Sequence, residues 1–410
     1  MEHHSFINMI LSQIDEFDVK PGDNVLQFAS LSFDASVSEI FMALLSGAAL
    51  VLTDKEVIND PFAFTDFLYQ YNVTIATLPP TLSRSLEPEK IGTQLKTLIS
   101  AGEAADVKSL LELSRYTNVY NAYGPTECSV CATYHKVGDL NGSEAYIPIG
   151  RPIPNNHIYI LDNHDKLVPI GLIGELCISG KGLSRGYLNN PELTSQKFTT
   201  NPFDHDTRIY RTGDMASWLP NGEIRFHGRK DDQVKIRGHR IEIGEVEEVM
   251  NQLDGIEKSF VMAVTDASGD QELVGYFSGL TQENEIALRD HLSMYLPHYM
   301  VPGELIAVDD FPITSNGKID RKALPKPGQS ASKETQYVKP GNSKEEILVE
   351  IWEMVLDRRH IGVEHNFFEV GGNSIKAIQL VSEIHKRFDV KVEVKTLFLN
   401  STIKKLAQVI

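Results

Sequence analysis

Apolar and polar residues alternate in a strand, helix, strand order along the first part of the sequence. "NVLQFASLSF", from Asn24, is typical of a strand, "SVSEIFMALLSG" has apolar residues at helical spacing, and "AALVL" is a second strand. Short apolar strands follow at "VTIATL", "LKTLIS" and "NVYNAYG", separated by helical stretches such as "DPFAFTDFLYQY" and "ADVKSLLELSRY". This alternation predicts an α/β core.

The pattern changes after Gly150 and again near residue 231. Glycine-punctuated strands such as "HIYILD", "GELCISG" and "GEIRFHGR" predict a β-rich subdomain of the same core. Three strands ("SFVMAVT", "ELVGYFSG", "GELIAVDD") alternate with helices ("EIGEVEEVMNQL", "NEIALRDHLSMYL"), which predicts a small α+β domain. "KPGQSASKETQYVKPGN" contains few apolar residues and is typical of a linker.

The last segment, from Ser343, has apolar residues at helical spacing throughout. Ile347, Ile351 and Val355 share one helix face, and "STIKKLAQVI" begins a final helix, so we expect a four-helix bundle. The whole chain is therefore expected to be multidomain: an α/β core with a β-rich part (1–230), an α+β subdomain (231–325), a linker (326–342) and an all-α domain (343–410).

Composition restricts the class of partner. The 410 residues carry a formal net charge of -17, and phosphate-rich surfaces select basic patches, so we expect neither a nucleic-acid nor a membrane partner. The sequence contains no apolar run of transmembrane length and begins with no basic stretch followed by an apolar signal core. We therefore expect a cytoplasmic location.

The three cysteines are too few for a disulfide framework. Cys128 and Cys131 form a C-x-x-C pair that can be redox-active or bind a metal, but no second pair or histidine cluster completes such a site. We interpret "CSVCATY" instead as a buried strand of small apolar residues.

Ser374 follows two glycines and an asparagine in "FFEVGGNSIKAIQL", at a predicted helix start. A serine nucleophile needs a base and a group that orients the base, and neither His365 nor His385 has an obvious carboxylate partner. A plain helix N-cap is the alternative.

Two further stretches carry groups that suit a nucleotide. "NAYGPTEC" places an aromatic ring, a hydroxyl and a carboxylate within five residues, which can stack on a base, contact phosphate and hold Mg²⁺, or can form only a turn. "YRTGDMASWLPNGEIRFHGRK" places Asp214 in a glycine turn, where it can accept from ribose hydroxyls, and Arg229 can pair with phosphate.

Several motifs in fixed order carry a resemblance. "FDAS", "NAYGPTE", "GELCISGKGLSRGYLNNPELT", "YRTGDMA", "GRKDDQVKIRGHRIE", "LPHYMVP" and "NGKIDRKALP" resemble the motif series of amino-acid adenylation domains of nonribosomal peptide synthetases. "FFEVGGNSIKA" resembles the phosphopantetheine attachment site of their carrier domains. The resemblance covers essentially the whole chain.

The resemblance implies an amino-acid adenylating ligase that uses ATP, Mg²⁺ and 4'-phosphopantetheine. It implies that a phosphopantetheinyl transferase modifies Ser374, and that neighbouring condensation or release domains are partners. Tyr123 would stack on adenine, Thr126 would contact phosphate and Glu127 would help hold Mg²⁺. Asp214 would bind the ribose hydroxyls and Arg229 the ribose and phosphate end. Lys318 would bridge the substrate carboxylate and the α-phosphate, and Asp231 would be the hinge between the core and the α+β subdomain.

Asp34 precedes an apolar helix whose capping box we assign to Ser36 and Glu39, so Asp34 is left without a capping role. In the family, the matching acid pairs with the α-amino group of the substrate. An acid in so apolar a stretch needs a cationic partner.

The family's substrate pocket matches a set of mostly small residues. The set comprises Asp34, Ala35, Ser38, Thr77, Ile99, Ala101, Ala122, Val130 and Cys131, with Lys318 at the carboxylate. Apart from the amine and carboxylate partners it contains no charge, so a charged substrate side chain would be buried without a partner. We expect an aromatic amino acid, and the Ser38 hydroxyl favours L-tyrosine over L-phenylalanine.

One departure from the family concerns the start of the sequence. The family's glycine- and serine-rich phosphate loop is expected just before "EHHSFIN", so we expect part of the adenylation core to be absent, and activity of this chain alone is open. Two other functions also stay open: an acyl- or aryl-acid ligase of the same superfamily, against which Asp34 argues, and a non-catalytic unit in which only the carrier works.

Overall fold

The structure is a computed structural model that describes part of the chain. The described residues are 1–58, 61–138, 146–230, 233–236, 238–265, 271–313, 319–327, 337–356, 358–367, 370, 374–388, 390, 392, 396–397 and 400–410. The chain forms two compact units, Met1–Arg240 and Ile241–Ile410, which are described separately. In the described part of the chain, no helix has the length and apolar character needed to cross a membrane.

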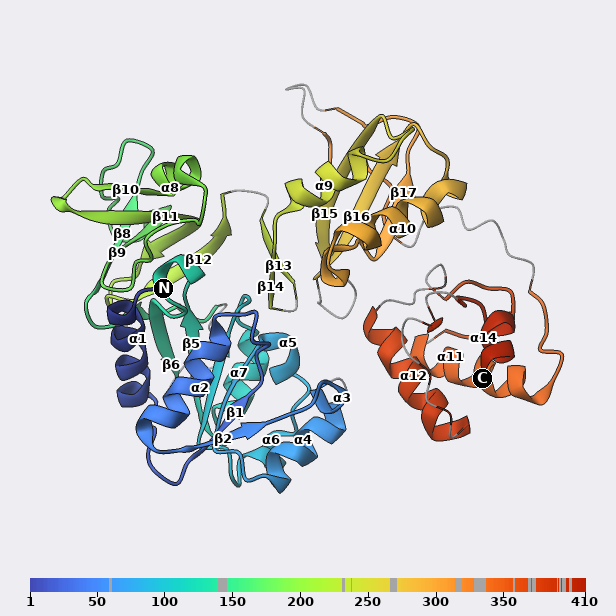
Figure 1. Cartoon of the computed structure of the whole chain (residues 1–410), viewed down its shortest axis with the longest axis horizontal. Coiled ribbons are helices and arrows are strands. Elements are labelled where there is room, and N and C mark those ends of the chain that lie inside the picture. Colours follow the sequence, from blue (N-terminus) through green and yellow to red (C-terminus); the bar gives the residue numbers. More distant parts are fainter. Residues whose placement is uncertain are drawn as a thin grey trace. The chain divides into compact units, whose positions relative to one another are not determined.

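A seven-stranded sheet forms the centre of the first unit, in the order β2-β1-β3-β4-β5-β6-β7. The pairs from β2 through β5 are parallel, and β6 and β7 add antiparallel strands at one edge. The strands are β1 (Asn24–Gln27), β2 (Ala49–Leu52), β3 (Ile75–Leu78), β4 (Thr97–Ala101), β5 (Asn118–Tyr123), β6 (Thr133–Val137) and β7 (Arg151–Pro152). The predicted strand, helix, strand start is confirmed (Figure 1).

Helices flank this sheet because successive strand residues alternate between its two faces. Leu26, Ala76 and Leu98 pack with α4 (Pro61–Gln70) and α7 (Val107–Leu113). Their sequence neighbours Val25, Ile75 and Ile99 point to the other face and lie in a second cluster. That cluster also contains Met42 and Ala43 of α2 (Ala35–Ser46) and Phe17, which follows the last residue of α1. The remaining helices are α1 (His3–Glu16), α3 (Lys55–Ile58), α5 (Pro80–Ser83) and α6 (Pro88–Ile91).

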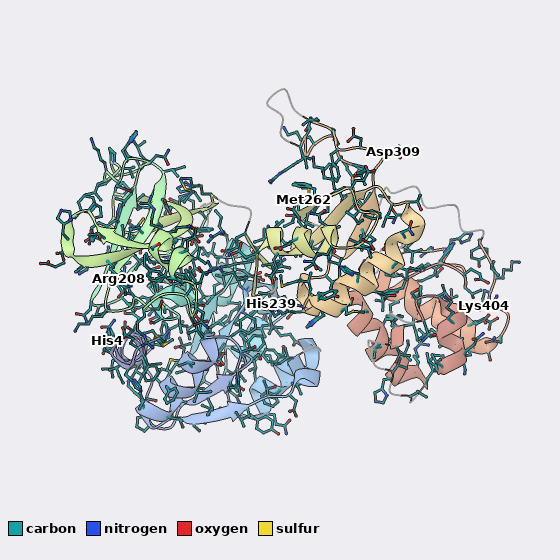
Figure 2. The ribbon with its side chains drawn as sticks, turned by 45° about the horizontal axis from the view of Figure 1, so that its top comes forward. His4, Arg208, His239, Met262, Asp309 and Lys404 are labelled. Atoms are coloured by element: carbon teal, nitrogen blue, oxygen red, sulfur yellow. The ribbon has the colours of Figure 1, made fainter. Side chains whose placement is uncertain are left out.

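A β-rich subdomain follows, as the glycine-punctuated strands predict. Its five-stranded antiparallel sheet contains β8 (Asn156–Leu161), β9 (Gly174–Gly180), β10 (Phe198–Asn201), β11 (Asp204–Trp218) and β12 (Ile224–Arg229), with α8 (Pro191–Lys197) inserted. Figure 2 marks Arg208 on β11. The hairpin of β13 (Val234–Ile236) and β14 (His239–Ile241) comes next in the chain.

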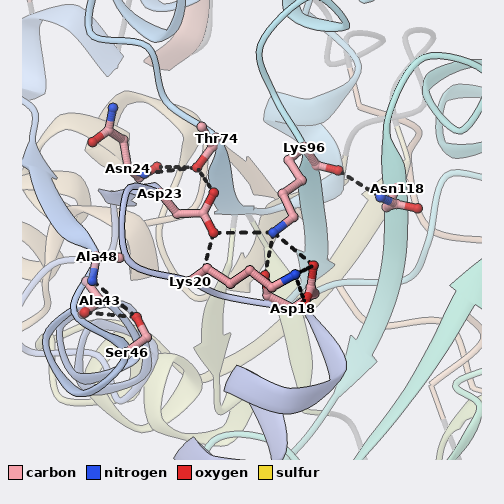
Figure 3. Close-up of polar contacts among 10 residues, drawn as sticks. All are labelled: Asp18, Lys20, Asp23, Asn24, Ala43, Ser46, Ala48, Thr74, Lys96 and Asn118. Atoms are coloured by element: carbon pink, nitrogen blue, oxygen red, sulfur yellow. Dashed lines mark hydrogen bonds and ion pairs between the residues drawn. The ribbon is translucent and has the colours of Figure 1, made fainter.

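Polar side chains join the amino ends of the parallel strands (Figure 3). Asp23, just before β1, accepts hydrogen bonds from the Lys20 amide nitrogen at 2.8 Å and from Thr74 Oγ1 at 3.0 Å. Lys96, just before β4, lies with its Nζ 3.3 Å from the same carboxylate, and its carbonyl accepts from Asn118 Nδ2 at 3.1 Å. These contacts occupy the amino ends of the strands. We therefore expect a ligand site at the opposite edge, where the parallel strands have their carboxyl ends.

The second unit begins with the predicted α+β domain. A three-stranded sheet contains β15 (Lys258–Thr265), β16 (Gln271–Ser278) and β17 (Glu304–Ala307), with β16 antiparallel to β15 and parallel to β17. Helices α9 (Ile243–Asn251) and α10 (Glu285–Tyr295) lie at the predicted positions. Val274, Tyr276 and Ile306 belong to the core of this domain.

The C-terminal domain is helical in its described part. It contains α11 (Ser343–Leu356), α12 (Ser374–Phe388) and α14 (Ile403–Val409). Its own core includes Trp352, Leu380 and Leu406, and the ring of Trp352 lies edge-on to Phe367 with centroids 5.0 Å apart. The observed architecture is the multidomain arrangement that the sequence predicts.

Candidate functional site

The candidate site lies at the carboxyl edge of the parallel strands, where β5 ends at Tyr123. The chain continues through Gly124 and Pro125 into a single 3₁₀ turn, Thr126–Cys128. A side chain at position 124 would place its Cβ 2.1 Å from the Val130 carbonyl oxygen, so only glycine lets the two segments pass. This close passage positions Thr126 and Glu127 just beyond the strand end, with Thr126 exposed and Glu127 buried.

Asp214 joins two other predicted site residues. The Tyr123 hydroxyl donates to Asp214 Oδ2, and Arg229 Nη1 donates to Asp214 Oδ1 at 2.6 Å. Burial, followed by the Asp214 charge and its hydrogen bond, raises the pKa of Tyr123 well above its usual value, so the phenol stays protonated and donates. The structure thus brings Tyr123 together with two side chains that lie far from it in the sequence.

The strand position of Asp214 differs from the prediction. Asp214 lies within the long strand β11, not in a turn. The preceding Gly213 has φ 75° and the strand register shifts between Arg211 and Met215. The glycine is needed at this irregularity of the strand, and the sequence analysis therefore took it for a turn, although the strand continues.

Glu127 has partners that the sequence analysis did not identify. Its carboxylate accepts from Arg240 Nη1 at 2.9 Å and from the Tyr187 hydroxyl at 2.7 Å. Burial alone would raise the pKa of Glu127, but the Arg240 charge and the Tyr187 hydrogen bond outweigh it, and the net pKa is lowered. Glu127 is therefore an ionised, buried carboxylate. In the sequence, Arg240 lies in the motif "GRKDDQVKIRGHRIE", but no local pattern connects it to Glu127, which is 113 residues away.

The nine predicted substrate-contact residues come from several segments that converge on the carboxyl edge. Thr77 pairs in register with Ile99, and Ala101 pairs with Ala122, on neighbouring strands. The others lie at the start of α2 (Asp34, Ala35, Ser38) and after the 3₁₀ turn (Val130, Cys131). Ligand sites in such sheets usually lie at the edge where the carboxyl ends of the parallel strands meet.

Gln13 of α1 is a member of this region that the sequence analysis missed. Ser38 Oγ donates to Gln13 Oε1 at 2.5 Å, and both side chains are buried. A hydrogen bond from the Gln13 side chain also lowers the pKa of the Cys131 thiol, although burial dominates and raises that pKa to about 12. Gln13 lies 25 residues before Ser38, so no local pattern connects them.

The predicted capping box of α2 is wrong. The helix begins at Ala35, its N-cap position is Asp34, and the Asp34 side chain makes no capping hydrogen bond. Ser36 Oγ donates to the Phe33 carbonyl at 2.7 Å instead. The Glu39 carboxylate accepts the amide hydrogens of Phe28 (3.1 Å) and Ala29 (3.0 Å), because the loop after β1 folds back over it.

The interpretation of "CSVCATY" as a buried strand is only partly right: the segment is largely buried, but only its last two residues belong to a strand. Ser129 and Val130 have φ of 59° and 69°, which breaks any strand, and β6 begins only at Thr133. Cys128, Cys131 and Cys177 are free and buried. In the described part of the chain, no group of three or more His, Cys, Asp or Glu residues is arranged to hold a metal.

For three predicted site residues, the structure describes either no atoms or the backbone alone. Lys318 and Asp231 lie outside the described residues. Ser374 is the first residue of α12, as predicted, but its side chain is outside the description. The roles of these residues stay predictions.

Comparison with protein families matches three parts of the chain in order. The models for an AMP-binding enzyme, an AMP-binding enzyme C-terminal domain and a phosphopantetheine attachment site match residues 1–188, 245–318 and 346–410. The fold and site therefore define an AMP-binding enzyme joined to a carrier domain.

Individual relatives define the family further. Over 99% of its length the chain is 44% identical to tyrocidine synthase 1 of Brevibacillus parabrevis, of which it spans 37%. It is also 44% identical, over its full length, to bacitracin synthase 3 of Bacillus licheniformis, of which it spans 6%. Among solved structures, holo-PA1221, described as an NRPS protein containing adenylation and PCP domains, matches with a TM-score of 0.77 and 28% identity, covering 95% of this chain and 66% of that one. The chain belongs to the adenylation and carrier family of nonribosomal peptide synthetases.

The donor set fits the groups that this family uses. Members bind ATP with Mg²⁺ and carry 4'-phosphopantetheine on the carrier domain. One buried, ionised carboxylate, Glu127, suits Mg²⁺ that is otherwise held by water and phosphates, because Mg²⁺ seldom uses an all-protein cage. The Asp214 carboxylate, held by Tyr123 and Arg229, keeps unused lone pairs that suit ribose hydroxyls.

Proposed function

We propose that the chain, within the protein that contains it, activates an amino acid and loads it onto its own carrier domain. The amino-acid carboxylate attacks the α-phosphorus of ATP, which gives aminoacyl-AMP and releases pyrophosphate. Ser374 would carry a phosphopantetheine arm, and the thiol of that arm would accept the aminoacyl group from aminoacyl-AMP, with AMP as the leaving group. The observation that carries the proposal is the cluster of Tyr123, Asp214 and Arg229 beside Glu127, on a chain that also contains a carrier domain.

We assign the chemistry of the first step to a few side chains. Tyr123 supplies the ring against adenine, Asp214 and Arg229 hold the ribose end, and Thr126 contacts phosphate. Glu127 helps hold Mg²⁺. Lys318 bridges the substrate carboxylate and the α-phosphate, where a compact positive charge stabilises the developing negative charge. Asp231 is the hinge at which the two arrangements of the enzyme interchange.

The substrate that we propose is an aromatic amino acid, with L-tyrosine preferred to L-phenylalanine. The small side chains of Ala35, Ala101 and Ala122 support a large substrate, because unfilled apolar volume loses contact energy. Asp34 supplies a negative charge for the α-amino group. The Ser38 hydroxyl donates its hydrogen to Gln13, so the Ser38 oxygen can accept a hydrogen bond from the phenol of a tyrosine substrate.

Amino-acid-dependent exchange of pyrophosphate into ATP tests the proposal. The assay uses the longest protein that contains the chain, with tyrosine, phenylalanine, leucine and valine, and with the des-amino analogue of tyrosine. We expect kcat/KM for tyrosine to be about tenfold or more above phenylalanine, because a site that bonds a hydroxyl discriminates against its absence. The des-amino analogue should be poor if Asp34 pairs with the amine.

A pair of serine variants supplies the control. Ser38→Ala should reduce the preference for tyrosine over phenylalanine. Ser46→Ala should leave it unchanged, because the Ser46 hydroxyl lies at the far end of the same helix, where it donates to the Ala43 carbonyl and accepts from the Ala48 amide. Phenylalanine ahead of tyrosine in the wild type refutes the finer assignment. Leucine or valine ahead of both refutes the aromatic assignment, and efficient use of the des-amino analogue favours an acyl- or aryl-acid ligase.

A further inference from the structure

The β13–β14 hairpin contacts the candidate site through several different side chains. His239, labelled in Figure 2, lies edge-on to Phe33, the neighbour of Asp34, with ring centroids 5.1 Å apart. The Gly238 amide donates to Glu103 Oε1 at 2.6 Å. Lys235 Nζ lies 5.8 Å from the centroid of the Tyr123 ring. The hairpin is therefore docked on the residues proposed to bind the nucleotide and the amino acid.

Arg240 makes the most consequential of these contacts. Its Nη1 lies 2.9 Å from Glu127 Oε2 and 3.2 Å from Oε1, so one guanidinium nitrogen contacts both carboxylate oxygens. Its Nε donates to Gln233 Oε1 at 2.8 Å, which fixes the guanidinium within the hairpin. The Tyr187 hydroxyl takes a further lone pair of Oε1. Glu127 is only 8% exposed, so it depends on such a partner for its charge.

We propose that Arg240 and the divalent cation compete for Glu127, so that docking of the hairpin and binding of the metal exclude each other. This inference rests on the proposed function, because it takes Glu127 to be a ligand of Mg²⁺. A metal ion and a guanidinium approaching the same two oxygens would repel each other at short range. Arg240 is thus a positioning residue that neutralises Glu127 in the arrangement from which metal and pyrophosphate have left.

Thermodynamic linkage means that the competition can be measured either through the metal affinity or through the docking of the hairpin. If docking lowers metal affinity by some factor, the metal must lower the docking equilibrium by the same factor. A purely structural ion pair has neither property, since its loss would affect stability without improving metal binding. Loss of Arg240 should therefore increase metal affinity if the two compete, and should not increase it if the ion pair is purely structural.

The first experiment titrates the protein with Mn²⁺, whose free ion is measured by electron paramagnetic resonance, at a saturating concentration of the α,β-methylene analogue of ATP. We expect Arg240→Gln to bind Mn²⁺ about fivefold or more tightly than wild type, at the low end of typical coupling between sites. The matched control is Arg151→Gln, which removes one exposed arginine that bonds the Asn221 carbonyl. Equal or weaker Mn²⁺ binding by Arg240→Gln, with the control like wild type, overturns the competition.

Glu127→Gln separates this inference from the proposed function. It should weaken Mn²⁺ binding if Glu127 is a ligand. If it has no effect, the metal role assigned to Glu127 is wrong and the competition fails with it, whereas the substrate panel would still report on amino-acid activation. If Glu127→Gln weakens binding and Arg240→Gln does not strengthen it, only the competition fails.

The second experiment needs no variant and covers the case in which Arg240→Gln folds poorly because it leaves Glu127 buried without its cation. Hydrogen exchange is measured on wild-type peptides that cover 233–241, with the ATP analogue alone and with the analogue plus Mg²⁺. We expect Mg²⁺ to accelerate exchange at the Gly238 amide, which is bonded to Glu103 in the docked hairpin. Unchanged or slower exchange on adding Mg²⁺ overturns the proposal. Arg240→Lys, which keeps the charge but not the planar fork, should give intermediate Mn²⁺ affinity.

Discussion

Glu39 is a buried acid whose environment is set by a single loop. Its side chain is fully buried on α2, and its hydrogen-bond donors are the backbone amides of Phe28 and Ala29. Burial outweighs those two bonds and raises the pKa of Glu39 to about 8. The loop that it holds continues to Asp34, so the protonation of Glu39 is connected to the position of the residue proposed to bind the substrate amine.

Stability should therefore depend on pH through Glu39. The folded-state pKa of about 8 lies above the ordinary value of 4.5, so between these values the folded chain binds a proton that the unfolded chain lacks. The free energy of unfolding contributed by this group then falls as pH rises across that window, by up to about 1.4 kcal/mol per pH unit. Glu39→Gln, which keeps a carbonyl acceptor for the two amides, should flatten this dependence and gain stability relative to wild type at pH 8.

Denaturant unfolding at pH 5.5 and pH 8 measures the effect, and Glu112→Gln, an exposed glutamate on α7, is the matched control. The control should follow wild type at both pH values. If Glu39→Gln and wild type lose stability in parallel between pH 5.5 and pH 8, the raised pKa of Glu39 is wrong.

How far a residue's position could be predicted depended on how local its signal is. Tyr123, Thr126 and Glu127 lie within one motif, and Asp214 and Arg229 lie in two others, so the sequence identified the residues that the structure brings together. Gln13 and Arg240 acquire their importance from partners 25 and 113 residues away. No spacing along the chain carries that information. The capping-box error has the same cause, since Glu39 bonds a loop that precedes its helix.

At the scale of elements, periodicity was a reliable guide. The alternation of strands and helices gave β1, α2 and β2 and the α+β domain at nearly the observed positions, because buried faces impose a period of two on strands and about 3.6 on helices. The failures are places where backbone conformation is irregular. The positive φ values at Ser129 and Val130, and the bulge beside Asp214, arise from close packing between segments and not from apolar spacing.

The irregular segment from Gly124 to Cys131 requires a residue without a side chain at position 124. Gly124→Ala would place a Cβ 2.1 Å from the Val130 carbonyl and 2.6 Å from Cys131 Cα, both in backbone that cannot easily move. We expect it to lower the free energy of unfolding by about 1–3 kcal/mol, as overpacking does, and to displace Glu127 from Arg240. Thermal and denaturant unfolding give the loss of stability.

Gly138→Ala is the matched control, because a Cβ there meets nothing within 4 Å. It should change stability by less than about 0.5 kcal/mol, as most surface substitutions do. A Gly124→Ala variant as stable as Gly138→Ala would show that the segment 124–131 relaxes freely, and the argument that this glycine fixes the site would fail.

At the scale of the whole molecule, the chain carries separate cores for separate tasks. The two faces of the large sheet have their own clusters, and the α+β domain has another. The carrier has a further one, whose buried members among the described residues lie between Leu348 and Leu406. A core drawn from one continuous segment can form without the rest of the chain. The carrier is therefore expected to be modified independently of adenylation.

That independence gives a prediction for Ser374. Incubating the chain with a phosphopantetheinyl transferase and coenzyme A should add one phosphopantetheine, because the serine begins α12 of a domain whose core includes Trp352, Leu380 and Leu406. Intact-mass analysis measures the adduct, Ser374→Ala should abolish it, and Ser401→Ala, at the turn before α14, should leave it in place. An adduct that survives Ser374→Ala would move the attachment site elsewhere. Absence of any adduct on a folded carrier, with cooperative unfolding confirmed, would contradict the assignment of this domain as a substrate for the transferase.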